Sequence, residues 1–357
     1  VCPHPEYCEG HCILGRKQTP VRIGQIEHYI GQFVLDSLDL YSTEEYEGNI
    51  AVIGGGPAGI ALAFFMQRVG YQVTIFDSQN RIGGIMRYGI PEFRLPNSIL
   101  ARLENKLREL GVIIHPNTLI GPVISVEDLL RDGYDAIFMS TGVWNPKKLN
   151  IPGETLGNSH YAIQYLKSPD YYTLCNRVAV IGAGNVAMDS ARTAIRQITQ
   201  DVTILYRKGE EDMPCRIDEY ESAKMDGVNF LFYSQPTRIT KEGVWYVKTD
   251  EEGNTEEYLH QCDSVIIAVS QESQKNIVAS APDIHLDERG RVIVNEEGMT
   301  TKAGVFASGD VTLGAQTINL AVTSAKKAAN GMHNLIQRKN NPDWENELIY
   351  SYDIMET

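Results

Sequence analysis

Basic residues are in short supply in this sequence of 357 residues. Its 32 lysines and arginines face 46 aspartates and glutamates, which gives a formal net charge of −14 at pH 7 and a pI of about 5.1. Proteins that bind nucleic acids or anionic membrane surfaces do so through a basic patch. The composition therefore predicts neither kind of partner.

Long uninterrupted hydrophobic runs are also absent. The most apolar stretch, residues 50–66, is broken by Pro57 and by four glycines, so it cannot form one continuous helix across a bilayer. No secretory signal is visible, and the sequence begins Val1-Cys2 without a methionine. We therefore expect no membrane span, a cytoplasmic protein, and further residues upstream of Val1.

Cysteine is scarce, and its six copies are unevenly placed. Cys175, Cys215 and Cys262 stand alone, whereas the other three cluster near the start of the chain. This pattern favours a reducing compartment, with the isolated cysteines as small buried hydrophobic residues. No G-x-S-x-G elbow points to hydrolysis, and no CxxC or Cx4C pair points to electron transfer through a dithiol.

Glycine, in contrast, is concentrated in two similar stretches, IAVIGGGPAGIALAFF from Ile50 and VAVIGAGNVAMDSART from Val178. Each has a predicted strand before the glycines, a predicted helix after them and a second strand beyond, as dinucleotide-binding βαβ units have. Glycine lets a diphosphate approach the backbone, and the helix start offers free N–H groups. The matching residues are Gly54, Gly56 and Gly59 in the first copy, and Gly182, Gly184 and Ala187 in the second.

The two units differ where their second strands end. The first strand ends in Asp77, whose carboxylate can accept hydrogen bonds from both ribose hydroxyls of FAD or NAD and would repel a 2′-phosphate. The second has Tyr206 at that place, followed by Arg207 and Lys208, which suit the extra phosphate of NADPH. NADH stays possible, because three acids follow closely: Glu210, Glu211 and Asp212.

The remaining pattern predicts an α/β protein with parallel sheets covered by helices. Further strands are predicted at 134–142, 262–270 and 303–310, and amphipathic helices at 23–38 and 317–336. Gly70 is expected to close the helix of the first unit. The polar and acidic end of the chain, residues 338–357, is expected to be a surface extension.

Cys2, Cys8 and Cys12 follow the spacing C-P-x4-C-x3-C, and thiolates at such spacings converge on a metal or a cluster. His4 and His11 are interleaved, so zinc or an unligated site stays open. A flavin nearby favours an iron–sulfur cluster, because zinc carries no redox chemistry. Three ligands are one short of four, so the fourth is expected from upstream or from a non-cysteine group.

Eight segments of the chain, in this order, resemble one enzyme family. They are CPHPEYCEGHC, PVRIGQIEHYI, GGGPAGIALA, GGIMRYGIPEFRLP, STGVWNPKKLNIPGE, GAGNVAMDSART, YRKGEEDMPCRIDEYESAKMDGV and GVFASGDVTLGAQTINLAVTSAKKAA. The chain resembles the small (beta) subunit of glutamate synthase and its relatives. These include the large subunit of NADH-dependent ferredoxin–NADP oxidoreductase and the flavin half of dihydropyrimidine dehydrogenase.

The resemblance implies three groups of site residues. FAD would contact Gly54, Gly56, Pro57, Ala58, Gly59, Asp77, Gly84, Arg87, Thr141, Gly142, Gly309, Asp310, Thr317 and Ile318. NADPH would contact Gly182, Gly184, Asn185, Ala187, Arg207, Lys208 and Arg216. A [4Fe–4S] cluster would take Cys2, Cys8 and Cys12. The chain departs from the family at Ser270, where glycine is usual, and at 324–329, where glycine and arginine are usual.

The resemblance also implies two Rossmann-like domains, the FAD domain being interrupted by the NAD(P)H domain. The expected parts are an iron–sulfur remnant (1–45), an FAD domain in two pieces (46–147 and 281–337), an NAD(P)H domain (148–280) and a tail (338–357).

The expected function is hydride transfer from NADPH to FAD, followed by single-electron transfer through the cluster to a larger catalytic or electron-accepting subunit. The alternatives are a stand-alone NAD(P)H:acceptor oxidoreductase, the reverse reaction from ferredoxin to NADP+, and a non-catalytic FAD-binding assembly subunit.

Overall fold

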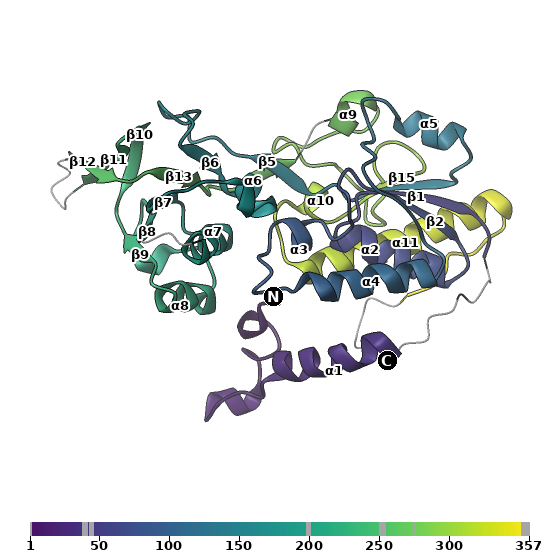
Figure 1. Ribbon diagram of the computed structural model, residues 1–357. Helices are drawn as coiled ribbons and strands as arrows, with labels where there is room; N and C mark the ends of the chain where they lie inside the picture. The colour runs from purple at the N-terminus through teal and green to yellow at the C-terminus, as the bar shows by residue number, and fades with distance from the viewer. Residues whose placement is uncertain are drawn as a thin grey trace. The chain divides into compact units, whose positions relative to one another are not determined.

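The computed structural model describes residues 2–37, 42, 46–197, 201–249, 255–273 and 276–350. Its chain divides into two units (Figure 1). The first comprises Val1–Met86, Leu95–Val143 and Ser273–Thr357, and the second comprises Arg87–Arg94 and Trp144–Glu272. The chain thus crosses between units near, but not at, the predicted boundaries 147/148 and 280/281, and Arg87–Arg94 joins the second unit.

The first unit is built on a parallel sheet in the order β15-β4-β1-β2-β3. Side chains of β1 alternate between two cores, because successive residues of a strand point to opposite faces. Ile50 and Val52 pack with helices α2 (Pro57–Arg68), α4 (Asn97–Glu109) and α11 (Ile318–Asn340), whereas Ala51 and Ile53 pack with α5 (Val126–Arg131) and α9 (Asn276–Ser280). The strands are β1 (Asn49–Ile53), β2 (Gln72–Phe76), β3 (Ile113–His115), β4 (Ala136–Met139) and β15 (Val305–Ala307).

The helices of this unit largely follow the predicted pattern. Helix α2 ends as expected: Gly70 has a φ of +112°, and the N–H groups of Gly70 and Tyr71 bond to the carbonyls of Gln67 and Met66. The helices are α1 (Ile23–Ser37), α2 (Pro57–Arg68), α3 (Ile85–Tyr88, which crosses the unit boundary), α4 (Asn97–Glu109), α5 (Val126–Arg131), α9 (Asn276–Ser280), α10 (Asp310–Leu313) and α11 (Ile318–Asn340).

The second unit repeats the sheet in the order β6-β13-β7-β8-β9, again with parallel pairs. One face packs on helices α6 (Ala162–Lys167), α7 (Asn185–Arg196) and α8 (Ile217–Met225). Its strands are β6 (Ser159–Tyr161), β7 (Arg177–Ile181), β8 (Asp201–Leu205), β9 (Asn229–Leu231) and β13 (Ser264–Ile267). Strands β5 (Val143–Pro146) and β14 (Gln271–Ser273) pair where the chain passes between the units.

The other face of this second sheet carries a feature that the sequence pattern did not reveal. An antiparallel three-stranded sheet, β10-β11-β12, covers it with Ile239, Val244 and Tyr246 (Figure 1). Its strands are β10 (Gln235–Thr240), β11 (Gly243–Thr249) and β12 (Thr255–Gln261).

The two ends of the described chain differ in packing. Helix α1 follows the short 3-10 helices η1 (His4–Glu6) and η2 (Ile13–Arg16) and buries none of its residues. Residue 38, the last of the predicted helix, lies outside the described residues. At the other end, the Trp344 indole N–H bonds to the Asn334 amide oxygen at 3.1 Å, so residues up to 350 pack on α11; residues 351–357 of the predicted tail are not described.

Two further expectations concern membrane spans and the isolated cysteines. Within the described chain, none of the helices combines the length and the apolar character needed to cross a membrane. The expectation of buried isolated cysteines holds for Cys262, holds only in part for the half-buried Cys215, and is wrong for Cys175, which is exposed. Cys175 has a φ of +61° at a turn just before β7, a place that leaves its side chain at the surface.

Candidate dinucleotide sites

The two glycine-rich turns have the same backbone geometry. Gly54 follows β1 with a φ of +99° and donates to the Phe76 carbonyl at 2.8 Å, while Gly182 follows β7 with a φ of +123° and donates to the Leu205 carbonyl at 3.0 Å. A Cβ on Gly54 would lie 2.7 Å from the Ser140 carbonyl oxygen. Both conformation and space therefore require glycine at the first position of each motif.

Neither backbone conformation nor lack of space for a Cβ explains the second glycine of each motif. Gly56 (φ −77°, ψ −172°) and Gly184 (φ −83°, ψ 176°) have conformations open to any residue. A Cβ on Gly56 would come no closer than 3.9 Å to another atom, and one on Gly184 would find nothing within 4 Å. The free space in front of each backbone fits a diphosphate that approaches more closely than a Cβ allows.

The third position of each motif is used for packing. A Cβ on Gly59 would lie 2.0 Å from the Gly54 carbonyl oxygen, so the helix could not approach the turn with alanine there. In the second unit Ala187 is completely buried at the equivalent place. Each third residue thus sets the distance between helix and strand.

Helices α2 and α7 also begin in the same way. Their N-cap residues are glycines, and no side chain of the described chain caps them. Helix α11, in comparison, begins with Thr317, whose hydroxyl accepts the Leu320 N–H at 3.3 Å. The first N–H groups of α2 and α7 are therefore open to an anionic ligand.

Asp77 is the first residue after β2 and is buried beside the first turn. One of its carboxylate oxygens accepts the Gly55 N–H and the other accepts the Gln79 N–H, both at 2.7 Å. These bonds hold the carboxylate at the edge of the turn, where an adenosine ribose lies in a βαβ dinucleotide site. Gly84 is brought to the same place, because a Cβ on it would lie 2.7 Å from the Gly56 Cα.

The segment after β15 supplies a second acid to the first unit. Gly309 has a φ of +75° and donates its N–H to the Ser324 hydroxyl on α11 at 3.3 Å. Ser324 belongs to the stretch 324–329, which differs from the family pattern, and its side chain thus contacts this turn. Asp310 accepts the Gln316 N–H at 3.1 Å, and burial raises the pKa of Asp310 to about 6. Hydrogen-bond donors of a ligand would be needed to stabilise its charged form.

The predicted FAD residues do not all lie in one unit. Thr141 and Gly142 follow β4, and a Cβ on Gly54 would lie 3.2 Å from the Thr141 Cα. Arg87 lies instead in the piece of chain that belongs to the second unit.

In the second unit, Tyr206 occupies the place of Asp77. The β7–β8 register pairs Ile181 with Leu205, just as the β1–β2 register pairs Ile53 with Phe76. Arg207 is exposed and has no hydrogen bond or ion pair with any residue that the structure describes. Lys208 lies 3.6 Å from a carboxylate oxygen of Asp212.

The predicted residue Arg216 is brought to α7 through its backbone. Its N–H donates to the side-chain oxygen of Asn185, the first residue of α7, at 3.0 Å. Its guanidinium pairs with Asp218. Arg207 is therefore the cation most available to a phosphate in this set.

Helix α7 carries an ion network that no local sequence pattern indicated. Arg94 lies 2.7 and 2.6 Å from the two carboxylate oxygens of Asp189, and it also pairs with Glu219. Arg192 joins Glu219 to Asp226 at 3.0 and 2.8 Å. The carboxylates of Asp189 and Glu219 are buried, so the network fixes segment 87–94 on α7.

The N-terminal cysteines are close in sequence but do not form a ready ligand set. Cys8 Sγ lies 3.5 Å from His4 Nδ1, and Cys2 Sγ lies 3.2 Å from the Asn319 amide nitrogen. Backbone N–H bonding, chiefly from Val21, lowers the pKa of Cys12, which favours the thiolate that a cluster requires. Among the described residues, no three His, Cys, Asp or Glu side chains are grouped to hold a metal ion.

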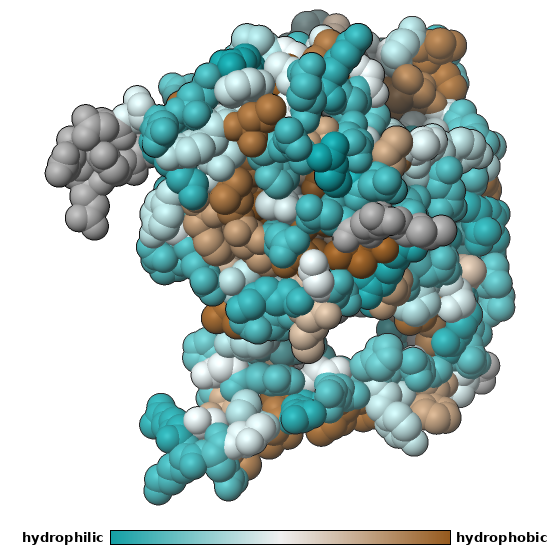
Figure 2. Space-filling model, turned by 60° about the vertical axis from the view of Figure 1, so that its left-hand side comes forward, coloured by the Kyte–Doolittle hydropathy of each residue, from teal (hydrophilic) through white to brown (hydrophobic). Residues whose placement is uncertain are grey.

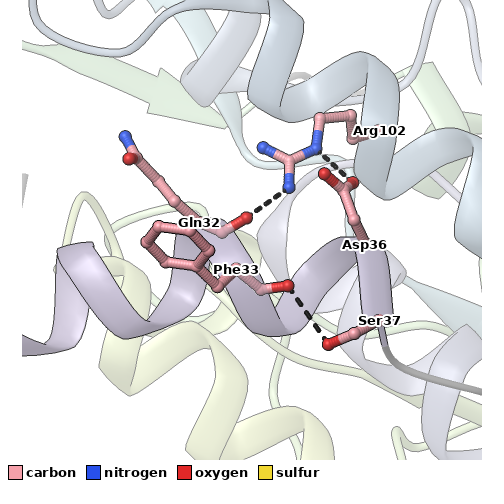
Figure 3. Close-up of a pocket in the computed structure, with 5 residues that line it drawn as sticks. All are labelled: Gln32, Phe33, Asp36, Ser37 and Arg102. Carbon is pink, nitrogen blue, oxygen red and sulfur yellow. Dashed lines mark hydrogen bonds and ion pairs between the residues drawn. The ribbon is translucent and has the colours of Figure 1, made fainter.

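A pocket of about 570 Å³ lies elsewhere in the first unit, between α1 and α4 (Figure 3). Arg102 reaches the Asp36 carboxylate and the Gln32 carbonyl oxygen, at 2.7 and 2.6 Å, with Phe33 beside them. None of the predicted cofactor residues lines it. Helix α1, which lines this pocket, exposes a row of apolar side chains: Ile26, Tyr29, Ile30, Phe33 and Val34. Hydrophilic residues, in contrast, cover most of the surface seen in Figure 2.

Comparison with known proteins agrees with this geometry. Residues 48–328 match the family described as pyridine nucleotide-disulphide oxidoreductase, and residues 1–37 match one described as dihydropyrimidine dehydrogenase domain II, 4Fe-4S cluster. The glutamate synthase [NADPH] small chain of Halomonas elongata is 34% identical over 93% of this chain and 78% of its own. That of Azospirillum brasilense is 32% identical over 93% and 77%.

Among solved structures, Mycobacterium tuberculosis FprA in complex with NADPH aligns with a TM-score of 0.69 at 18% identity, over 84% of this chain and 87% of that one. This likeness extends the agreement to the fold. The chain belongs to the pyridine nucleotide-disulphide oxidoreductase family and, within it, to the group that contains the glutamate synthase small chains. It is thus an FAD-dependent NAD(P)H oxidoreductase with a segment of a 4Fe–4S domain at its start.

Proposed function

We propose that this chain is the NADPH-oxidising subunit of an electron-transfer enzyme, which passes electrons through a 4Fe–4S centre to a larger partner subunit. The names of its relatives support this proposal, because a small chain implies a larger one. The observation that carries it is the pair of open turns whose strand ends differ: Asp77 in the first and Arg207 in the second.

The first unit is proposed to hold FAD, which when bound accepts a hydride and releases electrons singly. The uncapped start of α2 and the space at Gly56 would take the diphosphate, and Asp77 would accept bonds from the ribose. Asp310 would accept bonds from the ribityl hydroxyls, which would stabilise its buried charge. Other proposed contacts are Gly54, Pro57, Ala58, Gly59, Gly84, Arg87, Thr141, Gly142, Gly309, Thr317 and Ile318.

The second unit is proposed to hold NADPH in a matching way. The start of α7, with Gly184 and Asn185, would take the diphosphate, while Gly182 and Ala187 shape the turn. Arg207 would bind the 2′-phosphate, with Lys208 in support and Arg216 contributing less because Asp218 already neutralises it. The nearby acids keep NADH open as a weaker substrate.

For the 4Fe–4S centre we propose Cys2, Cys8 and Cys12 as ligands, with the fourth ligand from outside this set. Their placement in the described chain is not that of an assembled ligand set, so cluster insertion would have to draw them together. Cys175, Cys215 and Cys262 stand singly in the sequence, a pattern that suits the reducing environment of the cytoplasm. Cell fractionation would test this location.

Anaerobic stopped-flow mixing of the purified protein with NADPH and with NADH tests the function. We expect the flavin absorbance near 450 nm to bleach with NADPH, faster than with NADH at equal concentration. A bound flavin that neither nucleotide bleaches would overturn the proposal and favour an assembly subunit. Bleaching without iron in the protein, or without any partner on gentle purification, would favour a stand-alone oxidoreductase.

A further inference from the structure

The segment after β8 presents a charge problem to the proposed NADPH site. Arg207 and Lys208 are followed by the short 3-10 helix η4 (Glu210–Asp212), whose three residues are all acidic. Carboxylates so near would pair with the two cations and repel a 2′-phosphate. The inference below rests on the proposed function, since it concerns how the chain keeps those cations available.

Each of these acids is held by a specific partner. The Tyr220 hydroxyl donates to a Glu210 carboxylate oxygen at 2.7 Å, and the Tyr233 hydroxyl donates to a Glu211 carboxylate oxygen at 3.2 Å. The Tyr206 hydroxyl donates to the backbone carbonyl of Asp212 at 2.8 Å, which fixes the helix itself. Only Asp212 lies near a cation of the site, at 3.6 Å from Lys208.

Tyr233 is placed by an unusual backbone. Its φ is +53°, a left-handed conformation that residues other than glycine and asparagine rarely adopt. Its N–H donates to the Lys208 carbonyl at 3.1 Å, so the residue is attached to the strand end that carries the cations. Strain of this kind persists where the surrounding structure enforces it, and the hydroxyl of the residue so placed lies 3.2 Å from Glu211.

Gly209 lies directly against this contact. Its φ of −77° and ψ of 172° are open to any residue, so its backbone does not require glycine. A Cβ on it would lie 2.4 Å from both the Glu211 carboxylate oxygen and the Tyr233 hydroxyl. A side chain at position 209 would therefore displace the contact between Glu211 and Tyr233.

We propose that Tyr233 is a specificity-determining positioning residue: it holds Glu211 away from Arg207 and Lys208, and so preserves the preference for NADPH over NADH. Gly209 makes room for this contact. The Glu211 charge raises the pKa of Tyr233, as expected for a hydroxyl that donates to a carboxylate.

The test compares Tyr233→Phe with the wild type in anaerobic flavin reduction by NADPH and by NADH. Without the hydroxyl, Glu211 is free to pair with the cations. We expect KM for NADPH to rise roughly threefold, the size of one exposed ion pair, with kcat and the KM for NADH unchanged. The double variant Tyr233→Phe/Glu211→Gln should restore the KM for NADPH, since the competing charge is gone.

Tyr258→Phe is the matched control. It removes another tyrosine–glutamate contact, with Glu256 on the exposed strand β12 of the same unit, and should change neither KM. An unchanged KM for NADPH in Tyr233→Phe, an equal rise for both nucleotides, or failure of Glu211→Gln to restore it would overturn the inference. If the wild type itself does not prefer NADPH, the proposed function fails instead, and the two failures are distinguishable.

Discussion

The two units can be compared strand by strand, because each has a parallel sheet in which three neighbouring strands are followed by equivalent loops. These strands are β4, β1 and β2 in the first unit and β13, β7 and β8 in the second. Ser140 after β4 corresponds to Ala268 after β13, since each donates its N–H to the last residue of the central strand, Ile53 or Ile181. Two residues further on, Gly142 corresponds to Ser270. Asp77 corresponds to Tyr206 by the register described above.

The matched positions separate two kinds of residue. The first two motif glycines of the turn are the same in both units, because any dinucleotide needs a close approach to the backbone and open N–H groups, whereas the third position is Gly59 in one unit and Ala187 in the other. Those at the loop ends differ: Ser140 donates to the Gly54 carbonyl at 2.7 Å, and Ala268 has no hydroxyl to do so. We therefore expect the shared turn to bind a shared diphosphate and the loop ends to select the rest of the ligand.

The largest expected effect concerns the helices after the two turns, which differ in the side chains that they bury. Helix α2 buries no charged side chain, whereas α7 buries Asp189 against Arg94. Arg94→Gln leaves the buried Asp189 carboxylate without its partner and leaves Glu219 with Arg192 alone, so we expect a loss of about 3–5 kcal/mol in the free energy of unfolding at pH 8. Urea denaturation measures it, and Arg131→Gln, at an exposed ion pair of the first unit, should give no measurable change.

The same variant has a predicted pH dependence. Burial already raises the pKa of Asp189 to about 6 from 3.8, and removal of Arg94 raises it further. A buried carboxyl with a raised pKa costs stability as the pH rises through that pKa, and the cost disappears when it is protonated. The loss should therefore be smaller at pH 5 than at pH 8, and an equal loss at both would contradict this reading.

Substitution of Gly56 and Gly184 tests whether both turns bind a diphosphate. Gly56→Ala should weaken FAD binding at least roughly tenfold, because a methyl group fills the space meant for the diphosphate. Gly184→Ala should weaken NADPH and NADH alike by a similar factor and leave the FAD content unchanged. Neither Cβ clashes with protein atoms, so the cofactor-free forms of both variants should unfold at the urea concentration of the cofactor-free wild type. Destabilisation without loss of binding would show that packing, and not a ligand, selects these glycines.

The loop ends provide a smaller effect. Arg207→Ala should raise the KM for NADPH about tenfold, as expected for loss of one charge-assisted contact, and leave NADH unaffected. Lys208→Ala should have a weaker effect, because Asp212 already lies beside it, and Arg216→Ala a weaker one again. Steady-state kinetics with both nucleotides gives this order, and the reverse order would mean that ion pairing does not decide which cation binds the phosphate.

The smallest expected effect concerns Ser270, which stands where the first unit has Gly142. Its φ of +105° lies in a region that side chains avoid, and Gly142 has a φ of +69° at the matched place. Ser270→Gly should therefore raise the free energy of unfolding by about 1 kcal/mol. Gly142→Ser should lower it, and thermal unfolding of the two variants side by side would reveal a contrary result.

Local patterns were enough to predict much of this architecture. The strand–turn–helix units, the end of α2 at Gly70 and the last helix are all encoded within short windows, where spacing and glycine set the backbone. The difference between Asp77 and Tyr206 was visible for the same reason. The sheet β10-β11-β12 was not, because most side chains of its edge strand β12 are exposed and lack the alternation of a half-buried strand.

The contacts that the sequence could not reveal join residues distant in the chain. Arg94 and Asp189, or Glu211 and Tyr233, are charged or polar pairs that have no local pattern, so only the fold brings them together. The buried His333 likewise bonds Tyr71 and Glu347, both at 2.8 Å, and with Trp344 attaches the end of the chain to α11. A polar tail expected at the surface is thereby partly packed.

The most direct test is to count dinucleotides on the purified protein. Extracted flavin is quantified, and the holoprotein is then titrated with NADP+ by calorimetry. Two like turns with unlike loop ends should give one FAD per chain and one NADP+ site per chain, with FAD retained at saturating NADP+. Two NADP+ sites per chain, or release of FAD by NADP+, would contradict the account.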